Sequence, residues 1–171
     1  MIEVPIITER LIIRPFDPQD IDGYLRFMLD KESTKFLTFA PEQTTEEGAK
    51  SLFEYVIQAY GTPDIVHAYA IADKVTNVYM GSCGFAPYEN GIVECYYCVN
   101  PEYRGQGIAV EAMKAAIAVL ADIVEIRAYC HPDNTLAHVV ATRCKMKHIG
   151  LTQHKHLGFE GEMFVYECLC S

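Results

Sequence analysis

The residues best suited to chemistry lie in the middle of the chain. Glu94 interrupts an apolar segment, and Arg104, Gly105 and Gly107 follow it closely. Glycine lets the backbone approach a ligand, and the start of a helix presents unpaired N–H groups with a partial positive charge. One helix dipole contributes only about 0.3–1 kcal/mol at an exposed site, so useful affinity needs several converging amides together with Arg104. These residues predict a binding site for an anion, and a pyrophosphate fits best.

The segments on either side of the glycines must position this site. Residues 92–99 (IVECYYCV) are β-branched and aromatic and predict a buried strand, which Asn100 and Pro101 end. A helix is predicted after the glycines, because the apolar residues there have the three- and four-residue spacing of one helix face: Ala109, Ala112, Met113, Ala116, Ile117 and Leu120. A strand, a glycine turn and a helix start together are typical of an anion site.

Two common nucleotide-binding loops do not match this stretch. A P-loop requires Gly-x4-Gly-Lys-Ser/Thr, which is absent, and a dinucleotide fingerprint requires Gly-x-Gly-x-x-Gly in the first strand–helix turn. The pattern Arg104-x-x-Gly107-x-Ala109 instead resembles the acyl-CoA-binding signature of the GNAT N-acetyltransferases. The simpler alternative is a loop that only joins a strand to a helix, and further matches along the chain argue against it.

Three other segments extend this resemblance over nearly the whole chain. Residues 8–14 (TERLIIR) are similar to the Thr-Glu-Arg-Leu-x-Leu-Arg opening of the GNAT branch that includes ribosomal-protein and peptide N-terminal acetyltransferases. Residues 94–103 (ECYYCVNPEY) resemble that branch's Glu-Ile-Gly-Tyr segment leading into Pro-Glu-Tyr. Residues 131–134 (HPDN) resemble the region where the family places an asparagine beside the pantetheine arm.

The predicted elements agree with the fold that the resemblance implies. Residues 1–171 are expected to form a single GNAT-like domain, because one domain is usual at this length. The expected class is α/β (α+β), with a mixed, mostly antiparallel sheet of about seven strands flanked by helices. The resemblance implies that the fourth and fifth strands, residues 92–99 and 123–129, splay apart for acyl-CoA. The other predicted strands are residues 6–14, 66–72, 79–85, 151–157 and 162–169, and the predicted helices are 17–29, 44–61, 109–120 and 134–144.

The resemblance also assigns binding roles, with acetyl-CoA as the co-substrate. The main chain of Tyr97, Cys98 and Val99 would meet the acyl group and the pantetheine amides, and the Val99 amide would polarise the thioester carbonyl. Asn134 would lie beside the pantetheine arm. The pyrophosphate would meet the loop formed by Arg104, Gly105, Gln106, Gly107, Ile108 and Ala109.

Acetyl transfer to an amine requires a base and a means of accommodating the departing thiolate. Glu94 is the candidate base, since it aligns with the family's strand-four glutamate. The alternative is a glutamate at the solvated start of a strand, or one paired with an arginine. For the thiolate, this branch often has a serine where the chain has Ala137, and the helix contains no tyrosine. His138 is a catalytic candidate here, while Thr135, Tyr96, water or positioning alone stay open.

Two function classes follow. The first is an acetyl-CoA-dependent N-acetyltransferase that moves the acetyl group directly to a primary amine, on a protein N-terminus or a small molecule. Direct transfer is expected because no cysteine lies in a clear Cys-His-acid arrangement, Cys130 beside His131 being the nearest approach. The second is a CoA-binding regulatory or interaction module with weak or no turnover, which the altered helix after Asn134 would favour.

Composition and charge restrict the partners. A net charge of −9 repels phosphates, so no nucleic acid is expected, and a cationic amine is favoured as acceptor. No stretch of 18 uncharged apolar residues and no signal peptide is present, so no membrane association is expected. Seven cysteines scattered without a framework predict reduced thiols, a cytoplasmic location and no metal. An exposed final strand could pair with a second copy in a homodimer.

Overall fold

A computed structural model describes residues 3–62, 67–120 and 125–167. Eight strands form one sheet in the order β1-β2-β3-β4-β5-β6-β8-β7, and every neighbouring pair is antiparallel except β5 and β6. The strands are β1 (Ile6–Ile7), β2 (Leu11–Arg14), β3 (Ala68–Asp73), β4 (Tyr79–Glu89), β5 (Ile92–Val99), β6 (Glu125–Cys130), β7 (Lys147–Gln153) and β8 (Glu160–Glu167). The predicted mixed, mostly antiparallel sheet is confirmed.

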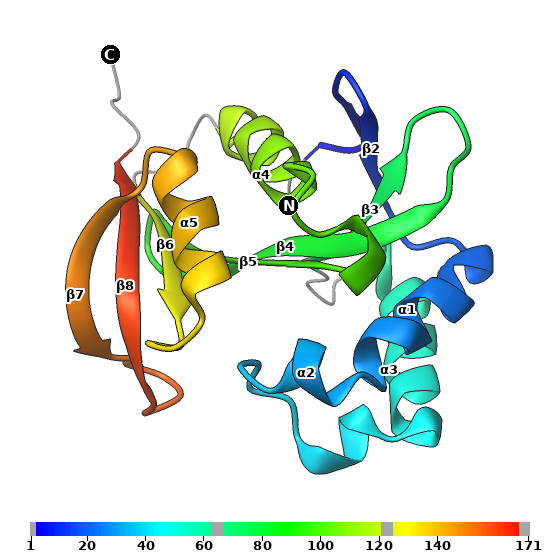
Figure 1. Cartoon of the computed structure of the whole chain (residues 1–171), viewed down its shortest axis with the longest axis horizontal. Coiled ribbons are helices and arrows are strands. Elements are labelled where there is room, and N and C mark those ends of the chain that lie inside the picture. The colour runs from blue at the N-terminus through cyan, green and yellow to red at the C-terminus, as the bar shows by residue number, and fades with distance from the viewer. Residues whose placement is uncertain (1–2, 63–66, 121–124, 168–171) are drawn as a thin grey trace.

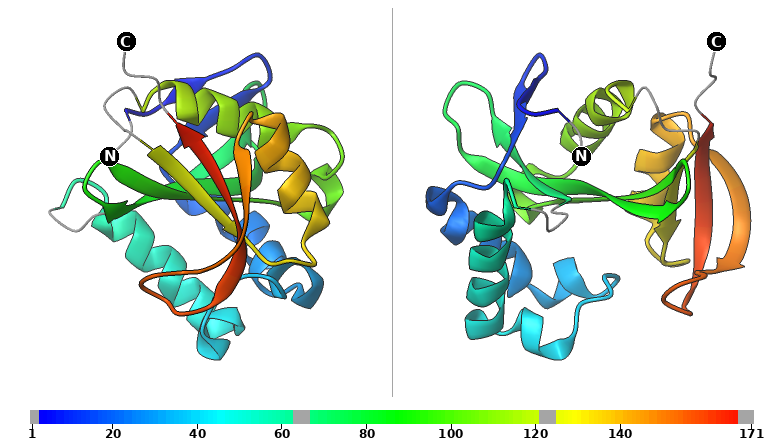
Figure 2. Two further views of the ribbon diagram at one scale, coloured as in Figure 1. Left: turned by 90° about the vertical axis from the view of Figure 1, so that its left-hand side faces the viewer. Right: turned by 180° about the vertical axis from the view of Figure 1, so that it is seen from behind.

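Helices cover both faces of this sheet. They are α1 (Ile21–Met28), α2 (Lys31–Thr34), α3 (Glu46–Ala59), α4 (Ile108–Ala118) and α5 (Thr135–Arg143), with 3-10 turns at Pro18–Asp20, Pro41–Thr44 and Pro101–Tyr103. Helices α4 and α5 lie on one face, and α1, α2 and α3 lie on the other (Figure 1; Figure 2 shows the same layers from two further sides). No helix in the described ranges is long and apolar enough to cross a membrane.

Each face has its own buried core. One core joins the sheet to α4 and α5 through residues such as Leu11, Cys95, Met113 and Ile126. The other joins the sheet to α1 and α3 and is mostly aromatic, consisting of Phe16, Tyr24, Phe27, Met28, Ala49, Phe53, Ala70 and Tyr79. The sheet is therefore fixed from both sides, and a site at its surface rests on rigid elements.

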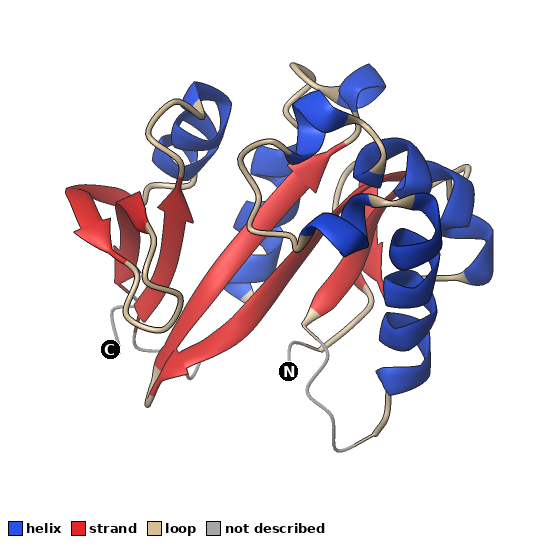
Figure 3. Ribbon diagram, turned by 90° about the horizontal axis from the view of Figure 1, so that it is seen from below, coloured by secondary structure: helices blue, strands red, loops and turns tan. Residues whose placement is uncertain are grey.

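Strands β5 and β6 separate soon after they meet. Their parallel register covers only Ile92–Glu94 of β5 against Glu125–Arg127 of β6. Beyond this point β5 stays paired with β4, and β6 stays paired with β8. The gap widens between the two ribbons in the view from below (Figure 3). The predicted splay between these strands is confirmed.

Several boundaries differ from the sequence prediction. The first strand is broken into β1 and β2, because the hydroxyl of Thr8 accepts a hydrogen bond from the Leu11 amide and turns the chain, which raises the number of strands from about seven to eight. The helix expected from Thr44 is capped one residue later by Thr45. Helix α2 was not predicted, because four residues give no apolar period.

The strand expected at residues 151–157 lies four residues earlier, as β7. Residues 154–159 instead form the turn to β8, closed by a hydrogen bond from the His154 amide to the Phe159 carbonyl at 2.7 Å. Burial of His154 at this turn, rather than at a strand position, accounts for the shift. The expected ends of other strands at residues 66, 123–124 and 168–169 lie outside the described residues.

Candidate active site

A cavity of about 520 Å³ lies where β5 separates from β6. Its walls come from the end of β5, the glycine loop with the first turn of α4, the start and inner face of α5, and α2 with the loop after it. Nine of the predicted binding residues line it: Tyr97, Cys98, Val99, Arg104, Gly105, Gly107, Ile108, Ala109 and Asn134. Residues far apart in sequence thus meet at one cavity.

The glycine loop presents main-chain N–H groups to this cavity. Gly105 and Gly107 have φ angles of +74° and +78°, a left-handed conformation that side-chain-bearing residues adopt only with strain. Gly107 is the N-cap of α4, and no side chain caps the helix there. The first-turn amides are therefore available to an anion. A Cβ on Gly105 would meet no atom within 4 Å, so the loop is open on that side.

Residues of the N-terminal segment hold this loop in place. The Glu111 carboxylate on α4 accepts hydrogen bonds from the Thr8 hydroxyl at 2.6 Å and from the Arg10 amide and Nε at 2.9 and 2.7 Å. Arg10 also donates to the Gln106 carbonyl at 3.0 Å. The Gln106 side chain donates to the Glu102 carbonyl and lies outside the cavity lining. Gln106 is thus the one predicted loop residue that the structure places away from the cavity.

Arg104 links the glycine loop to the opposite wall. Its Nε donates to the Val99 carbonyl at 3.0 Å, and its Nη2 donates to the Ser33 hydroxyl on α2 at 2.5 Å. The Ser33 hydroxyl in turn donates to Asp30 at 2.5 Å. Hydrogen bonding from Ser33 is the main cause that lowers the pKa of Asp30, and the Arg104 charge adds to it. Arg104 therefore both lines the cavity and orders α2 beside it.

Tyr97 extends from β5 to α5. Its hydroxyl donates to the Ala137 carbonyl at 2.8 Å and lies 3.9 Å from the Cys130 thiol. Burial raises the pKa of Tyr97 far above its ordinary value, so this hydroxyl stays protonated. Burial also raises the pKa of Cys130, to about 11, and the side chain is only 5% exposed. Cys130 is therefore a neutral thiol at physiological pH.

The start of α5 is ordered by the asparagine that the resemblance singled out. Asn134 Oδ1 accepts from the Ala137 amide at 3.2 Å and so caps the helix. His138 does not line the cavity: its Nε2 lies 3.1 Å from the His131 carbonyl, and its ring is 5.5 Å from Phe164 of β8. Asn134, expected beside the pantetheine arm, therefore lines the cavity, whereas His138, the candidate for the thiolate, does not.

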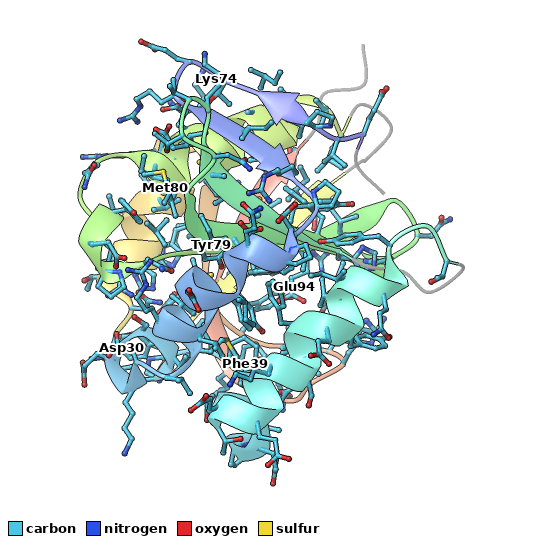
Figure 4. The ribbon with its side chains drawn as sticks, turned by 90° about the vertical axis from the view of Figure 1, so that its right-hand side faces the viewer. Asp30, Phe39, Lys74, Tyr79, Met80 and Glu94 are labelled. Carbon is cyan, nitrogen blue, oxygen red and sulfur yellow. The ribbon has the colours of Figure 1, made fainter. Side chains whose placement is uncertain are left out.

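Glu94 is the last residue of β5 that pairs with β6, opposite Arg127. Its neighbours Cys95 and Val99 face the core under α4, whereas Cys98 packs on the core of α1 and α3. Strand alternation therefore places the Glu94 side chain on the face of the sheet that α1 and α3 cover. Figure 4, in which Glu94 is labelled, is viewed from a side on which α1 and α3 lie in front. The carboxylate is 26% exposed and accepts a hydrogen bond from His154 Nε2 at 2.8 Å.

Sequence reasoning missed four features of the site. The His154 contact joins residues 60 positions apart and has no local signal. The direction of the Tyr97 side chain could have been found, because alternation along β5 separates it from Tyr96. The stacking of Phe36 on His131, with ring centroids 4.8 Å apart, joins the loop after α2 to the loop before α5. Arg143 and Lys35 also add cationic side chains to the cavity.

No cluster of three His, Cys, Asp or Glu side chains suited to a metal ion occurs among the described residues. Five cysteines in those ranges are unpaired. Cys95 and Cys98 face opposite sides of β5, so this Cys-x-x-Cys pair does not converge on one ion.

Comparison with known proteins identifies the family. Residues 10–147 match the model of the acetyltransferase (GNAT) domain, and the chain therefore belongs to the GNAT acetyltransferase family. The uncharacterized N-acetyltransferase p20 of Bacillus licheniformis is 27% identical over 135 residues, which cover 76% of this chain and 75% of that protein. The chain is accordingly an acyltransferase of the N-acetyltransferase type.

Solved structures show the same fold. An acetyltransferase (GNAT family) from Bacillus anthracis has a TM-score of 0.79 at 21% identity, covering 95% of this chain and 97% of that one. RimL, a ribosomal L7/L12 alpha-N-protein acetyltransferase in complex with coenzyme A, has a TM-score of 0.75 at 18% identity, covering 96% and 98%. The family and the fold that the sequence resemblance implied are both confirmed.

Proposed function

We propose that the protein binds acetyl-CoA in the 520 Å³ cavity and transfers the acetyl group directly to a primary amine, with Glu94 as the base. One observation carries this proposal. The strand opening that begins after Glu94 leads into a cavity walled by the uncapped amides of the glycine loop. Glu94 does not line the cavity itself and lies at the point where the opening between the strands begins.

The residues present fit acetyl-CoA. The α4 amides and the cationic side chains of Lys35, Arg104 and Arg143 suit the phosphates. Among the described residues, no strand pairs with Tyr97, Cys98 and Val99 on the β6 side of β5, and this free main chain suits a ligand with amide groups. RimL, which shares the fold, is described in complex with coenzyme A, and this supports the same ligand here. Acetyl-CoA supplies the activated acyl group.

Glu94 takes the proton that the amine loses, directly or through water. The new bond joins the amine nitrogen to the acyl carbon, the carbon–sulfur bond breaks, and its electron pair goes to sulfur. A carboxylate in this position suits general base catalysis, which contributes about 10²–10⁴-fold to a rate. The Val99 amide is the candidate donor to the thioester carbonyl.

The hydroxyl of Tyr97 is the candidate donor to the departing sulfur, and its single O–H must turn away from the Ala137 carbonyl to donate there. It contacts α5 at Ala137, the position where the related branch often has serine, so the hydroxyl reaches the same place from β5 instead of α5. Because burial keeps it protonated, it stabilises negative charge by donating a hydrogen bond rather than by releasing its proton. Of the other candidates, Thr135 lines the cavity, whereas His138 and Tyr96 do not.

The acceptor is proposed to be a primary amine, on a protein N-terminus or a small molecule. The net charge of −9 favours a cationic amine over a neutral hydroxyl compound. RimL is an alpha-N-protein acetyltransferase of the same fold, which supports a peptide N-terminus as the first acceptor to test.

The test is thiol release from acetyl-CoA in the presence of short peptides with free N-termini and a panel of small amines. Matched peptides with acetylated N-termini are the control. Release that needs the free amine, with acetyl-peptide formed in equal amount by mass spectrometry, supports the proposal. CoA binding measured by calorimetry without release on any amine would instead support the CoA-binding module.

A further inference from the structure

His154 occupies an unusual place for a histidine. Its side chain is 2% exposed and lies in the turn between β7 and β8. The ring stacks on Phe159 with centroids 4.9 Å apart, and it also packs on Tyr129 at 4.7 Å and on the edge of Tyr88 at 5.2 Å. Three aromatic side chains from three segments therefore fix the position of the imidazole.

The hydrogen bonds of the ring fix its tautomer. Nδ1 lies 3.1 Å from the amide nitrogen of Leu157 and 3.3 Å from that of His156. Amide N–H groups can only donate, so Nδ1 must accept and carries no hydrogen. The proton of the neutral imidazole is then on Nε2, which donates to Glu94 Oε2 at 2.8 Å.

We propose that His154 is a positioning residue for acyl transfer, which as the neutral Nε2–H tautomer holds Glu94 Oε2 and leaves Oε1 free to take the proton of the acceptor. This inference rests on the proposed role of Glu94. A base on a long side chain has several rotamers, and a fixed hydrogen bond at one oxygen selects the reactive one. The sequence placed Glu94 in the site, but only the structure shows what orients it.

The same geometry excludes His154 as a proton relay. A proton arriving at Nδ1 would face two N–H groups that already point at it, so both hydrogen bonds would break. The other titratable or charged groups around the ring are Tyr88 of β4, Arg127 and Tyr129 of β6, and His156 of the same turn.

A spectroscopic test reads the tautomer directly. In the full chain with ¹⁵N-labelled histidine, NMR of the imidazole nitrogens is recorded from pH 5.5 to 8.5, with His154→Gln used to assign the signals. The expected result at neutral pH is a ring with its proton on Nε2 and none on Nδ1, and a slowly exchanging Nε2 proton that is altered in Glu94→Gln. An Nδ1–H or doubly protonated ring at neutral pH would overturn the inference.

A kinetic test separates positioning from structure, using thiol release with the best amine of the panel. His154→Phe keeps an aromatic ring and is expected to lower kcat about 10-fold or more, whereas His154→Gln, which restores an N–H donor, recovers part of the loss. His156→Phe is the matched control, because His156 packs on Tyr88 and bonds its carbonyl but does not contact Glu94. It should leave kcat within about twofold.

Two further readings make the outcome decisive. Loss of the donor from His154 lets the carboxylate bind a proton more readily, so the acidic limb of the kcat/KM profile should move to higher pH in His154→Phe and stay in place in His156→Phe. In a Glu94→Gln background, His154→Phe should add little. Independent, multiplicative losses would overturn the positioning role. Full activity of Glu94→Gln alone would instead reject the proposed base and so separate the two failures.

Discussion

The Tyr97 hydroxyl of β5 and the Ala137 carbonyl of α5 are joined by a hydrogen bond of 2.8 Å across one wall of the cavity. This contact places a protonated hydroxyl beside the position where related enzymes often have a serine hydroxyl. The donor proposed for the departing sulfur thus belongs to the sheet rather than to α5, and its single O–H must leave the Ala137 carbonyl to act there.

Replacement of Tyr97 by phenylalanine tests this donor. Hydrogen bonds to charged groups contribute about 1.5–3 kcal/mol, so Tyr97→Phe should lower kcat about 10- to 100-fold with little change in CoA affinity. Single-turnover thiol release measures the effect. Adding Ala137→Ser to Tyr97→Phe should restore part of the rate, because it returns a hydroxyl to the same wall. An unchanged kcat in Tyr97→Phe would leave the role to water or to another side chain.

The glycine loop is tested by Gly107→Val, which should abolish CoA binding in calorimetry. The left-handed φ of +78° strains any side chain there, and the bulk blocks the close approach of phosphate to the backbone. Gly61→Val is the matched control, because Gly61 has a φ of +77° with no atom within 4 Å of an added Cβ and does not line the cavity. Both variants carry the same strain, so CoA affinity that is equal in the two folded proteins would reject the loop as the site.

Glu94→Gln should lower turnover at neutral pH by a factor of about 10² or more, because the amine then loses its base. The rate should recover in part as pH rises and free amine forms without help, while CoA affinity stays unchanged. Glu89→Gln is the control, since Glu89 lies at the end of β4 and pairs with Lys155 at the surface. A Glu94→Gln enzyme with the parent's rate at neutral pH would assign the base elsewhere.

Direct transfer predicts no acetyl-enzyme. The Cys130 thiol is buried, with a pKa raised to about 11, so almost none of it is thiolate at neutral pH. Mass spectrometry of the protein with acetyl-CoA and no acceptor should show no added acetyl group, and steady-state lines should intersect. Cys130→Ala should keep most activity. An acetyl thioester on Cys130 formed at a competent rate, with parallel lines, would contradict direct transfer.

Acid should weaken the hydrogen bonds by which Thr8 and Arg10 hold Glu111 beside the glycine loop. Burial alone would raise the pKa of Glu111, but hydrogen bonds from Thr8 and Arg10 outweigh it and lower that pKa. A depressed pKa in the folded state stabilises the protein above the unfolded-state value, and this stabilisation is lost as pH falls through the folded value. Glu111→Gln should therefore lower the free energy of unfolding by about 1–2 kcal/mol at pH 7, and the difference should shrink below about pH 4.

Urea unfolding at pH 7 and at about pH 3 measures this dependence. Glu46→Gln is the control, since Glu46 is an exposed helix residue paired with Lys50, and its loss should change stability little. A difference between the parent and Glu111→Gln that stays constant from pH 7 to about pH 3 would show that the charge of Glu111 does not stabilise the loop.

The glycine loop and its flanking strand and helix could be predicted because their signals are local. The left-handed backbone at position 107 favours glycine, and the helix after it shows the spacing of its apolar residues in the sequence. Glu94 could be found because a charge interrupts an apolar strand. Its partner His154 could not be predicted, since the two residues meet only because the turn between β7 and β8 packs against β6.

The error in the predicted position of β7 also comes from packing that the local sequence does not report. Residues 151–157 carry the composition of a strand, yet burial of His154 among aromatic rings turns the chain there and moves β7 toward Lys147. Likewise, His138 looked available from its position after Asn134, but the first turn of α5 directs its ring toward Phe164. Tertiary packing decided both outcomes, and no local pattern reports it.

The three-residue pairing of β5 with β6 leaves a strand edge inside the sheet instead of at its margin. Such an edge offers alternating backbone donors and acceptors to any extended chain of matching spacing, the property that makes exposed edges prone to aggregation. Here the first turn of α4 and the inner face of α5 line the cavity beside this edge. Short extended diamides with a blocked end would fill this slot as a false strand, which makes β-strand mimetics the class of inhibitor that the architecture invites.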